Sequence, residues 1–134
     1  MAIRLRYRVE TSVSSSQADL KDLGNVCVDV LTDAPSEGGI WKTRVLKTAT
    51  VTLPLDSISA AVFLMLRVVA ADPTEVLKPV EVTLNGTATF SLAPVAGAKE
   101  ANFLLSTSAL SSLQIANTAV DAVDVDITIG TAGD

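Results

Sequence analysis

The segment Val123-Asp124-Val125-Asp126-Ile127-Thr128-Ile129 alternates β-branched apolar residues with polar ones along its whole length. Successive side chains of a β-strand point to opposite faces, so this alternation predicts a strand with one buried and one solvated face. Each fully buried apolar side chain stabilises a fold by about 1.5–3 kcal/mol. Such a strand needs a second layer to pack on, so the segment predicts stacked β-sheets.

The other end of the chain repeats this pattern with the opposite charge. Residues 3–10 also alternate, and their polar positions carry Arg4, Arg6 and Arg8. Opposite charges that face each other across paired strands contribute about 0.2–1 kcal/mol per pair. We therefore expect the first and last strands to be neighbours, within one subunit or between two, with the arginines facing Asp124 and Asp126. Two alternatives remain open: the arginine face meets an acidic partner, or both charged faces are solvated.

An apolar stretch, residues 58–71, lies in the middle of the chain, and its Val and Phe content favours a strand over a helix. As a strand it places Leu64 and Leu66 on one face and Phe63 and Met65 on the other, so both faces are apolar. Such a strand needs cover on both sides, and in a chain this short we expect another subunit to supply one of them.

Residues 40–46 predict a further strand, which contains the single tryptophan, Trp41. Two interpretations of Trp41 remain open. It is either a core or sheet-edge aromatic residue, or the anchor of an interface, a role in which tryptophan is enriched.

Turn-forming residues divide the chain into about eight to nine short strands at intervals of about 8–12 residues, which is typical of a β-sandwich or jelly roll. Loops are expected over 33–39 and 94–99, and Asn85-Gly86 predicts a hairpin with a three-residue loop, 84–86. The 134 residues fit one domain. We therefore expect a single all-β, antiparallel, jelly-roll-like sandwich over 1–134, with a loose tail at 130–134.

The composition argues against several functions. The chain has no histidine, which excludes nucleophile systems that depend on it and removes the commonest transition-metal ligand. Its net charge of −5 disfavours nucleic acid and anionic membranes as partners. The single cysteine, Cys27, cannot form an internal disulfide. We expect no enzymatic activity and no cofactor, and the charged N-terminal residues predict folding in a cytoplasm without a signal peptide.

Three acids near the C-terminus, Asp121, Asp124 and Asp126, leave two chemical possibilities open. Asp124 and Asp126 would share a strand face at about 6.6–7 Å, a separation that a glycosidase pair can use. All three could also bind calcium through hard oxygen ligands. Because only 4% of residues are aromatic and the spacing of a calcium loop is missing, we favour a solvated or arginine-paired face.

The second half contains Val-Glu-Val-Thr-Leu-Asn-Gly-Thr-Ala-Thr-Phe-Ser-Leu over 80–92 and Ser-Ser-Leu-Gln-Ile-Ala-Asn-Thr over 111–118, followed by a short Asp/Val strand that closes on Gly130. In this style, residues 77–130 resemble small structural proteins of tailed bacteriophages. The resemblance implies a β-sandwich that decorates or cements a capsid shell, or builds a neck or tail, and is located in the virion.

The expected function is a non-enzymatic capsid decoration or cement protein. It would act as a homo-oligomer, expected to be a trimer, that binds the major capsid protein or another virion protein, with no nucleic-acid or membrane partner. The expected interface residues are Arg4, Arg6, Arg8, Trp41, Phe63, Met65, Asp124 and Asp126. The alternative is a carbohydrate- or receptor-binding module of a fibre or tail, which requires exposed aromatic residues in a loop cleft.

Overall fold

The computed structural model describes residues 5–14, 22–32, 37–53, 55, 61–95 and 98–133. These residues form strands and their connections, which confirms the all-β prediction. Within them there is no helix long and apolar enough to cross a membrane. The chain divides into two compact units, Met1–Pro35 and Ser36–Asp134.

The first unit contains an antiparallel pair of strands, β1 (Leu5–Ser14) and β2 (Asp22–Thr32). β1 extends through part of a Ser/Thr run to Ser14, and β2 begins at Asp22. Pairing between the two strands outweighs the weak turn preference of the Ser/Thr run, because strand propensity depends strongly on cross-strand context.

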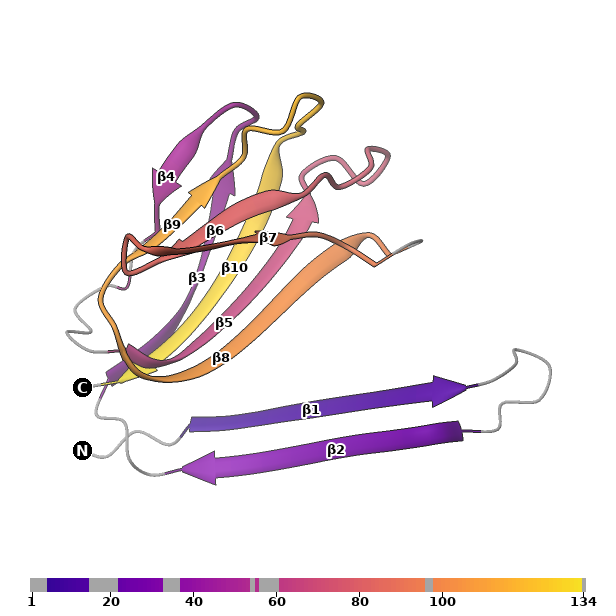
Figure 1. The fold of residues 1–134 in the computed structure, drawn as a ribbon, viewed down its shortest axis with the longest axis vertical. Helices are drawn as coiled ribbons and strands as arrows, with labels where there is room; N and C mark the ends of the chain where they lie inside the picture. Colours follow the sequence, from indigo (N-terminus) through magenta and orange to yellow (C-terminus); the bar gives the residue numbers. More distant parts are fainter. Residues whose placement is uncertain are drawn as a thin grey trace. The chain divides into compact units, whose positions relative to one another are not determined.

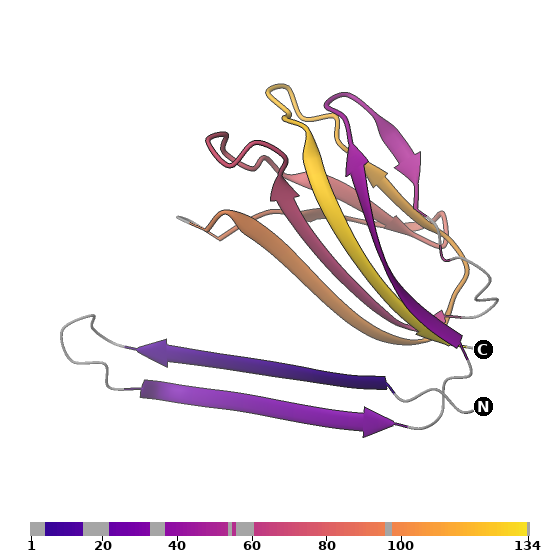
Figure 2. The ribbon, with the colours of Figure 1, turned by 180° about the vertical axis from the view of Figure 1, so that it is seen from behind.

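The second unit is the predicted antiparallel β-sandwich (Figure 1). The strands of the sheet that we call the large sheet are, in spatial order, β3 (Glu37–Val45), β10 (Val125–Gly133), β5 (Ala61–Ala70) and β8 (Glu100–Leu110). Those of the small sheet are β4 (Thr50–Thr52), β9 (Leu113–Ala116), β6 (Val80–Leu84) and β7 (Ala88–Leu92). Figure 2 shows the two sheets from behind.

The order of the strands defines the type of sandwich. Apart from the β6–β7 hairpin, each connection within the second unit carries the chain from one sheet to the other. Eight strands wound in this way around two facing sheets form a jelly roll. The jelly-roll-like fold class predicted from the sequence is therefore confirmed.

The core lies between the two sheets and is built from alternate strand positions. On β10, Val125, Ile127 and Ile129 are all 0% exposed, as the alternation in the last strand predicts. On β5, Leu64 and Leu66 are also 0% exposed, which confirms the strand interpretation for residues 61–70. These side chains pack with buried residues of the small sheet, namely Val80, Val82, Leu92, Leu113 and Ile115.

The expected pairing of the first and last strands is wrong. β10 lies between β3 and β5 along its whole length, so neither of its edges is free, and β1 pairs with β2. The residue that pairs with Asp126 on β3 is Arg44. A cross-strand charge pair contributes too little free energy to decide which strand lies beside β10. The apolar packing of the strands decides this, and it places Arg44, not Arg4, Arg6 or Arg8, opposite Asp126.

The expected loose tail is also wrong over 130–133, which form the end of β10 and are buried. The first residues of β3 lie beside this end of β10 and were expected to be part of a loop over 33–39. Instead, Gly38 pairs with Ala132 and Gly39 with Thr131. Small residues on both strands allow the backbones to pair closely where larger side chains would crowd. That the whole chain forms one domain stays a prediction, since the sandwich belongs to the second unit alone.

Candidate interaction surface

The face of the large sheet that points away from the small sheet carries a contiguous apolar row. Its residues occupy paired positions across all four strands: Ile40 on β3, Gly130 on β10, Met65 on β5 and Leu104 on β8. Ile40 is 71% exposed and Leu104 is 41% exposed, while Met65 is half-buried. We call Ile40, Met65 and Leu104, which flank Gly130, the apolar row.

Gly130 makes the row continuous. A Cβ atom at this position would lie 3.3 Å from Met65 Cε and 4.0 Å from Ile40 Cγ1. The side chains of Met65 and Ile40 therefore close over the glycine from its two sides. A larger residue at position 130 would separate them, so the missing side chain is what joins β3 and β5 into one apolar surface.

Phe63 and Ala132 occupy the next paired positions on this face, toward the small-residue end of β10. Phe63 is 7% exposed and Ala132 is 2% exposed, yet neither belongs to the core cluster between the sheets. β5 is therefore apolar on both faces, as predicted, with Leu64 and Leu66 facing the core. The interface role of Phe63 and Met65 stays a prediction.

Two ion pairs lie on the same face beyond the apolar row. Arg44 Nε donates to Asp126 Oδ1 at 2.7 Å, and its second nitrogen donates to Oδ2 at 3.2 Å. This hydrogen bond lowers the pKa of Asp126 and raises that of Arg44. Arg67 Nε donates a hydrogen bond to Glu100 Oε2 across β5 and β8. Each pair joins one cation to one anion, so these four residues add no net charge to the face.

The three aspartates near the C-terminus are held by three different partners. Lys78 Nζ contacts Asp121 Oδ2 at 2.6 Å, and this hydrogen bond lowers the pKa of Asp121. The backbone N–H of Lys47 donates to Asp124 Oδ1 at 2.8 Å. No group of three or more acidic or cysteine residues in the described part of the chain could hold a metal ion. For Asp126, the ion pair with Arg44 matches the arginine-paired interpretation.

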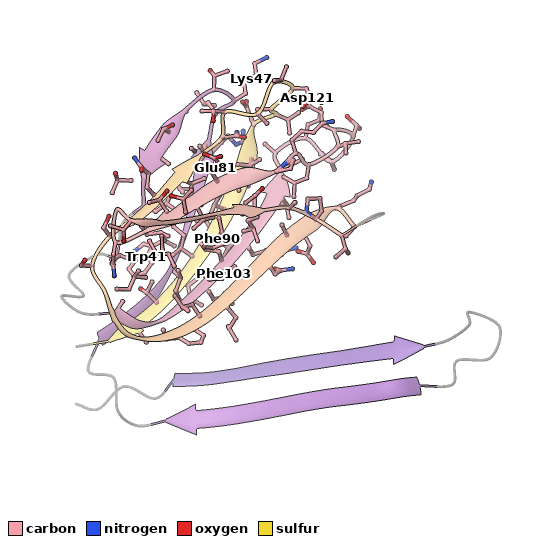
Figure 3. The ribbon with its side chains drawn as sticks, viewed as in Figure 1. Trp41, Lys47, Glu81, Phe90, Phe103 and Asp121 are labelled. Atoms are coloured by element: carbon pink, nitrogen blue, oxygen red, sulfur yellow. The ribbon has the colours of Figure 1, made fainter. Side chains whose placement is uncertain are left out.

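Trp41 lies on β3, an edge strand of the large sheet, at a position that faces the sandwich interior. It is half-buried and packs against the core. A Cβ atom at Gly39 would lie 3.0 Å from two atoms of its ring, so the ring covers the glycine closely. In Figure 3 it lies toward the opposite end of the sandwich from Lys47 and Asp121. These contacts match a core or sheet-edge aromatic residue.

The arginines of the first strand are not brought to Asp124 and Asp126 by strand pairing. Arg6 and Arg8 occupy β1 positions opposite Leu31 and Asp29 of β2. Arg4 lies outside the described residues. Their role at an interface stays a prediction.

The structure draws attention to residues that were not predicted as interface residues. Ile40 and Leu104 are the exposed members of the apolar row, and Arg44 is the cation beside Asp126. The sequence could have indicated Ile40, because positions 40, 42 and 44 share one face of the strand and Ile40 is the apolar residue beside two charged ones, Lys42 and Arg44. Leu104 gives no such signal, since its strand is apolar at consecutive positions.

Two shallow hollows adjoin the ion pairs. One, of about 320 Å³, is lined mainly by charged residues, among them Lys47, Glu75 and Asp124. The other, of about 530 Å³, is lined by Arg67, Val69, Pro73 and their neighbours. Neither is lined by an aromatic residue, so neither offers the stacking platform that a sugar-binding cleft requires.

No family model and no curated protein sequence matches the chain. A solved structure described under "Bacillus endospore appendages form a novel family of disulfide-linked pili" is similar over 75% of this chain and 95% of that chain, with 20% sequence identity and a TM-score of 0.39. The architecture of the second unit is that of a jelly-roll sandwich with an apolar row on the outer face of one sheet.

Proposed function

We propose that this protein is a non-enzymatic structural protein that acts by assembly, as a homo-oligomeric decoration or cement protein on the capsid of a tailed bacteriophage. The observation that carries the proposal is the apolar row. Ile40 and Leu104 are exposed on the same sheet face, with Met65 between them. Contiguous exposed apolar side chains on a soluble domain mark interaction surfaces.

The surroundings of the row support the same function. Stable interfaces combine an apolar centre with a polar, solvent-accessible rim. Here the rim consists of the Arg44–Asp126 and Arg67–Glu100 pairs, whose side chains are between 42% and 57% exposed. Because each charge is already paired within the chain, a partner can dock without leaving one of them uncompensated.

The capsid as a location is supported by the fold and by the sequence style of residues 77–130. Jelly rolls form viral capsid domains as well as lectin domains. This is a fold-level analogy, because one fold serves many functions. In such a role each contact is weak, and symmetric repetition over the shell multiplies the contacts into stable attachment. The number of copies, for which the sequence predicts three, stays a prediction.

The lectin-like alternative requires exposed aromatic side chains around a cleft. Trp41 is half-buried against the core, and neither of the two hollows described above is lined by an aromatic residue. A glycan-array screen separates the two functions, since specific glycan binding would favour the alternative.

Light scattering combined with mass spectrometry of co-sedimenting proteins tests the proposal. We expect an oligomer at micromolar concentration and co-sedimentation with capsid protein in a phage lysate. Ile40→Ser should weaken co-sedimentation several-fold, because it removes the most exposed side chain of the row. Val76→Ser is the matched control, since Val76 is 69% exposed but lies in the connection before β6. A monomer that binds no particle would contradict the proposal.

A further inference from the structure

The edges of the two sheets differ in how they are protected against pairing with another strand. In the small sheet the edge strands are short: β4 has 3 residues and β7 has 5. In the large sheet, β3 carries Lys42 and Arg44, and charged residues discourage edge-to-edge pairing. β8 is different, because it has 11 residues and neither a charge nor a proline after Glu100. Among the described strands it pairs with β5 alone.

We propose that β8 pairs antiparallel with β8 of a second copy of this chain, across a two-fold axis at Leu104. The proposal rests on the proposed function, assembly with copies of itself, and identifies the surface that one copy presents to another. A two-fold operation brings the same edge of both copies together, so each strand completes the hydrogen bonds that the other leaves open.

The register follows from the faces of the strand. When the two-fold axis passes through a residue of the strand, residues on the outer face of one copy lie opposite residues on the outer face of the other. An axis between two residues would instead set Leu104 opposite Leu105, which lie on different faces of the sheet. An axis at Leu104 sets the 41% exposed leucine opposite its own copy. Phe103 then lies opposite Leu105, and both are partly buried residues packed against the core. Aromatic–aliphatic cross-strand pairs stabilise a sheet.

The same axis joins the two apolar rows. Leu104 is the last member of the row, and it lies on the edge strand that would form the junction. The row of one copy, from Ile40 to Leu104, would thus continue into the row of the other. Glu100 meets Ser108 in this register, so no like charges face each other across the junction.

Cysteine cross-linking tests the axis. In a Cys27→Ser background, Leu104→Cys places the two new thiols directly opposite each other, within the Cα separation that a disulfide needs. Asn102→Cys is the matched control on the same strand and face, because its two copies would be separated by about 13 Å along the strands. With oxidised glutathione, we expect Leu104→Cys to form a covalent dimer at least ten-fold faster than Asn102→Cys.

A second set of variants keeps Cys27 and tests the same axis by charge. The Leu104→Lys variant should be a monomer, and so should Leu104→Glu, because like charges would face each other across the axis. An equimolar mixture of the two variants should form the dimer again, because opposite charges then face each other. Ile40→Lys on the other edge strand should leave the dimer intact.

Each result decides between the two proposals. A closed trimer, the number of copies that the sequence predicts, has no two-fold axis. Such a trimer, or a wild-type oligomer without cross-linking at position 104, would overturn the β8 pairing and leave assembly as the function. A wild-type monomer would overturn both. Faster cross-linking of Asn102→Cys than of Leu104→Cys would show that the axis lies elsewhere and would also overturn the proposed register.

Discussion

Arg44 and Asp126 lie opposite each other on β3 and β10 and form a two-pronged ion pair, with Arg44 Nε 2.7 Å from Asp126 Oδ1. The alternating strand at the C-terminus therefore has an arginine partner, as its sequence suggests, but the arginine comes from β3. Bidentate arginine–carboxylate geometry fixes orientation as well as supplying energy. The pair thus orients two side chains across β3 and β10, whose register is set by the apolar packing of the strands.

This pair predicts a pH-dependent loss of stability in acid. The pKa of Asp126 lies below its usual value of 3.8, so its carboxylate stabilises the folded state above that pH. The contribution is lost as the pH falls through the lowered pKa. At pH 7, Asp126→Asn should show a small decrease in the free energy of unfolding by urea, as is typical of exposed pairs. This difference should vanish well below pH 3.8.

Arg44→Gln provides the control for that measurement. This substitution removes the other half of the ion pair. The free energy of unfolding of the double variant, Arg44→Gln with Asp126→Asn, should therefore be no lower than that of either single variant. Fully additive losses would show that the two residues act independently, contrary to the geometry.

Asn117 predicts a larger effect on stability. It is 0% exposed, and its Nδ2 donates to the carbonyl oxygens of Val45, at 3.4 Å, and Val123, at 2.7 Å. Its backbone also bonds to Thr48 and Ala49. Asn117→Ala would leave two carbonyl groups without this donor, so we expect a loss of about 1–3 kcal/mol in the free energy of unfolding.

Urea unfolding followed by circular dichroism measures this loss. Thr118→Ala is the control, because Thr118 is the exposed neighbour of Asn117. Equal stability of Asn117→Ala and the wild type would mean that the side chain does not join the end of β3 to the segment before β10.

The close packing of Trp41 against Gly39 predicts that a side chain at position 39 would change the tryptophan fluorescence. A Cβ atom there would lie 3.0 Å from the Trp41 ring, so Gly39→Ala should displace the ring. Inserting a methyl group into packed structure costs about 1–3 kcal/mol. We expect both this loss and a shift of the Trp41 fluorescence emission toward longer wavelength as the ring becomes more exposed. Lys42→Ala, at an exposed position beside Trp41, should leave the emission unchanged.

The β6–β7 hairpin predicts a cost for any side chain at Gly86. Its loop is Asn85-Gly86-Thr87, closed by the bond from Thr87 N–H to the Leu84 carbonyl at 3.1 Å. Gly86 has φ of +70°, where residues with a Cβ atom are disfavoured by about 1–2 kcal/mol. Gly86→Ala should therefore lower the thermal midpoint measurably, whereas Thr87→Ala in the same loop should not. An unchanged midpoint for Gly86→Ala would show that the loop adopts another turn.

The length of the β6–β7 loop could be predicted from the sequence, but its position in the chain could not. The requirement that faces match predicts a loop with an odd number of residues, and the loop does have three. The loop is 85–87 and not 84–86, so Val80 pairs with Leu92. Both registers match faces equally well. In the observed register, Asn85 Oδ1 accepts hydrogen bonds from the backbone N–H groups of Ser111 and Ser112, contacts outside the hairpin that no local rule includes.

The alternation of residues 123–129 is enough to indicate the all-β class and the inward-facing positions of β10, because a period of two is a local property of a strand. The sequence also showed that β5 is apolar on both faces. The folded chain alone shows which strands are neighbours, that Arg44 is the partner of Asp126, and that residues 130–133 continue a strand. It also brought Ile40, Met65 and Leu104 from three strands into one row. Pairing between distant strands depends on the packing of both sheets at once, and no single segment encodes it.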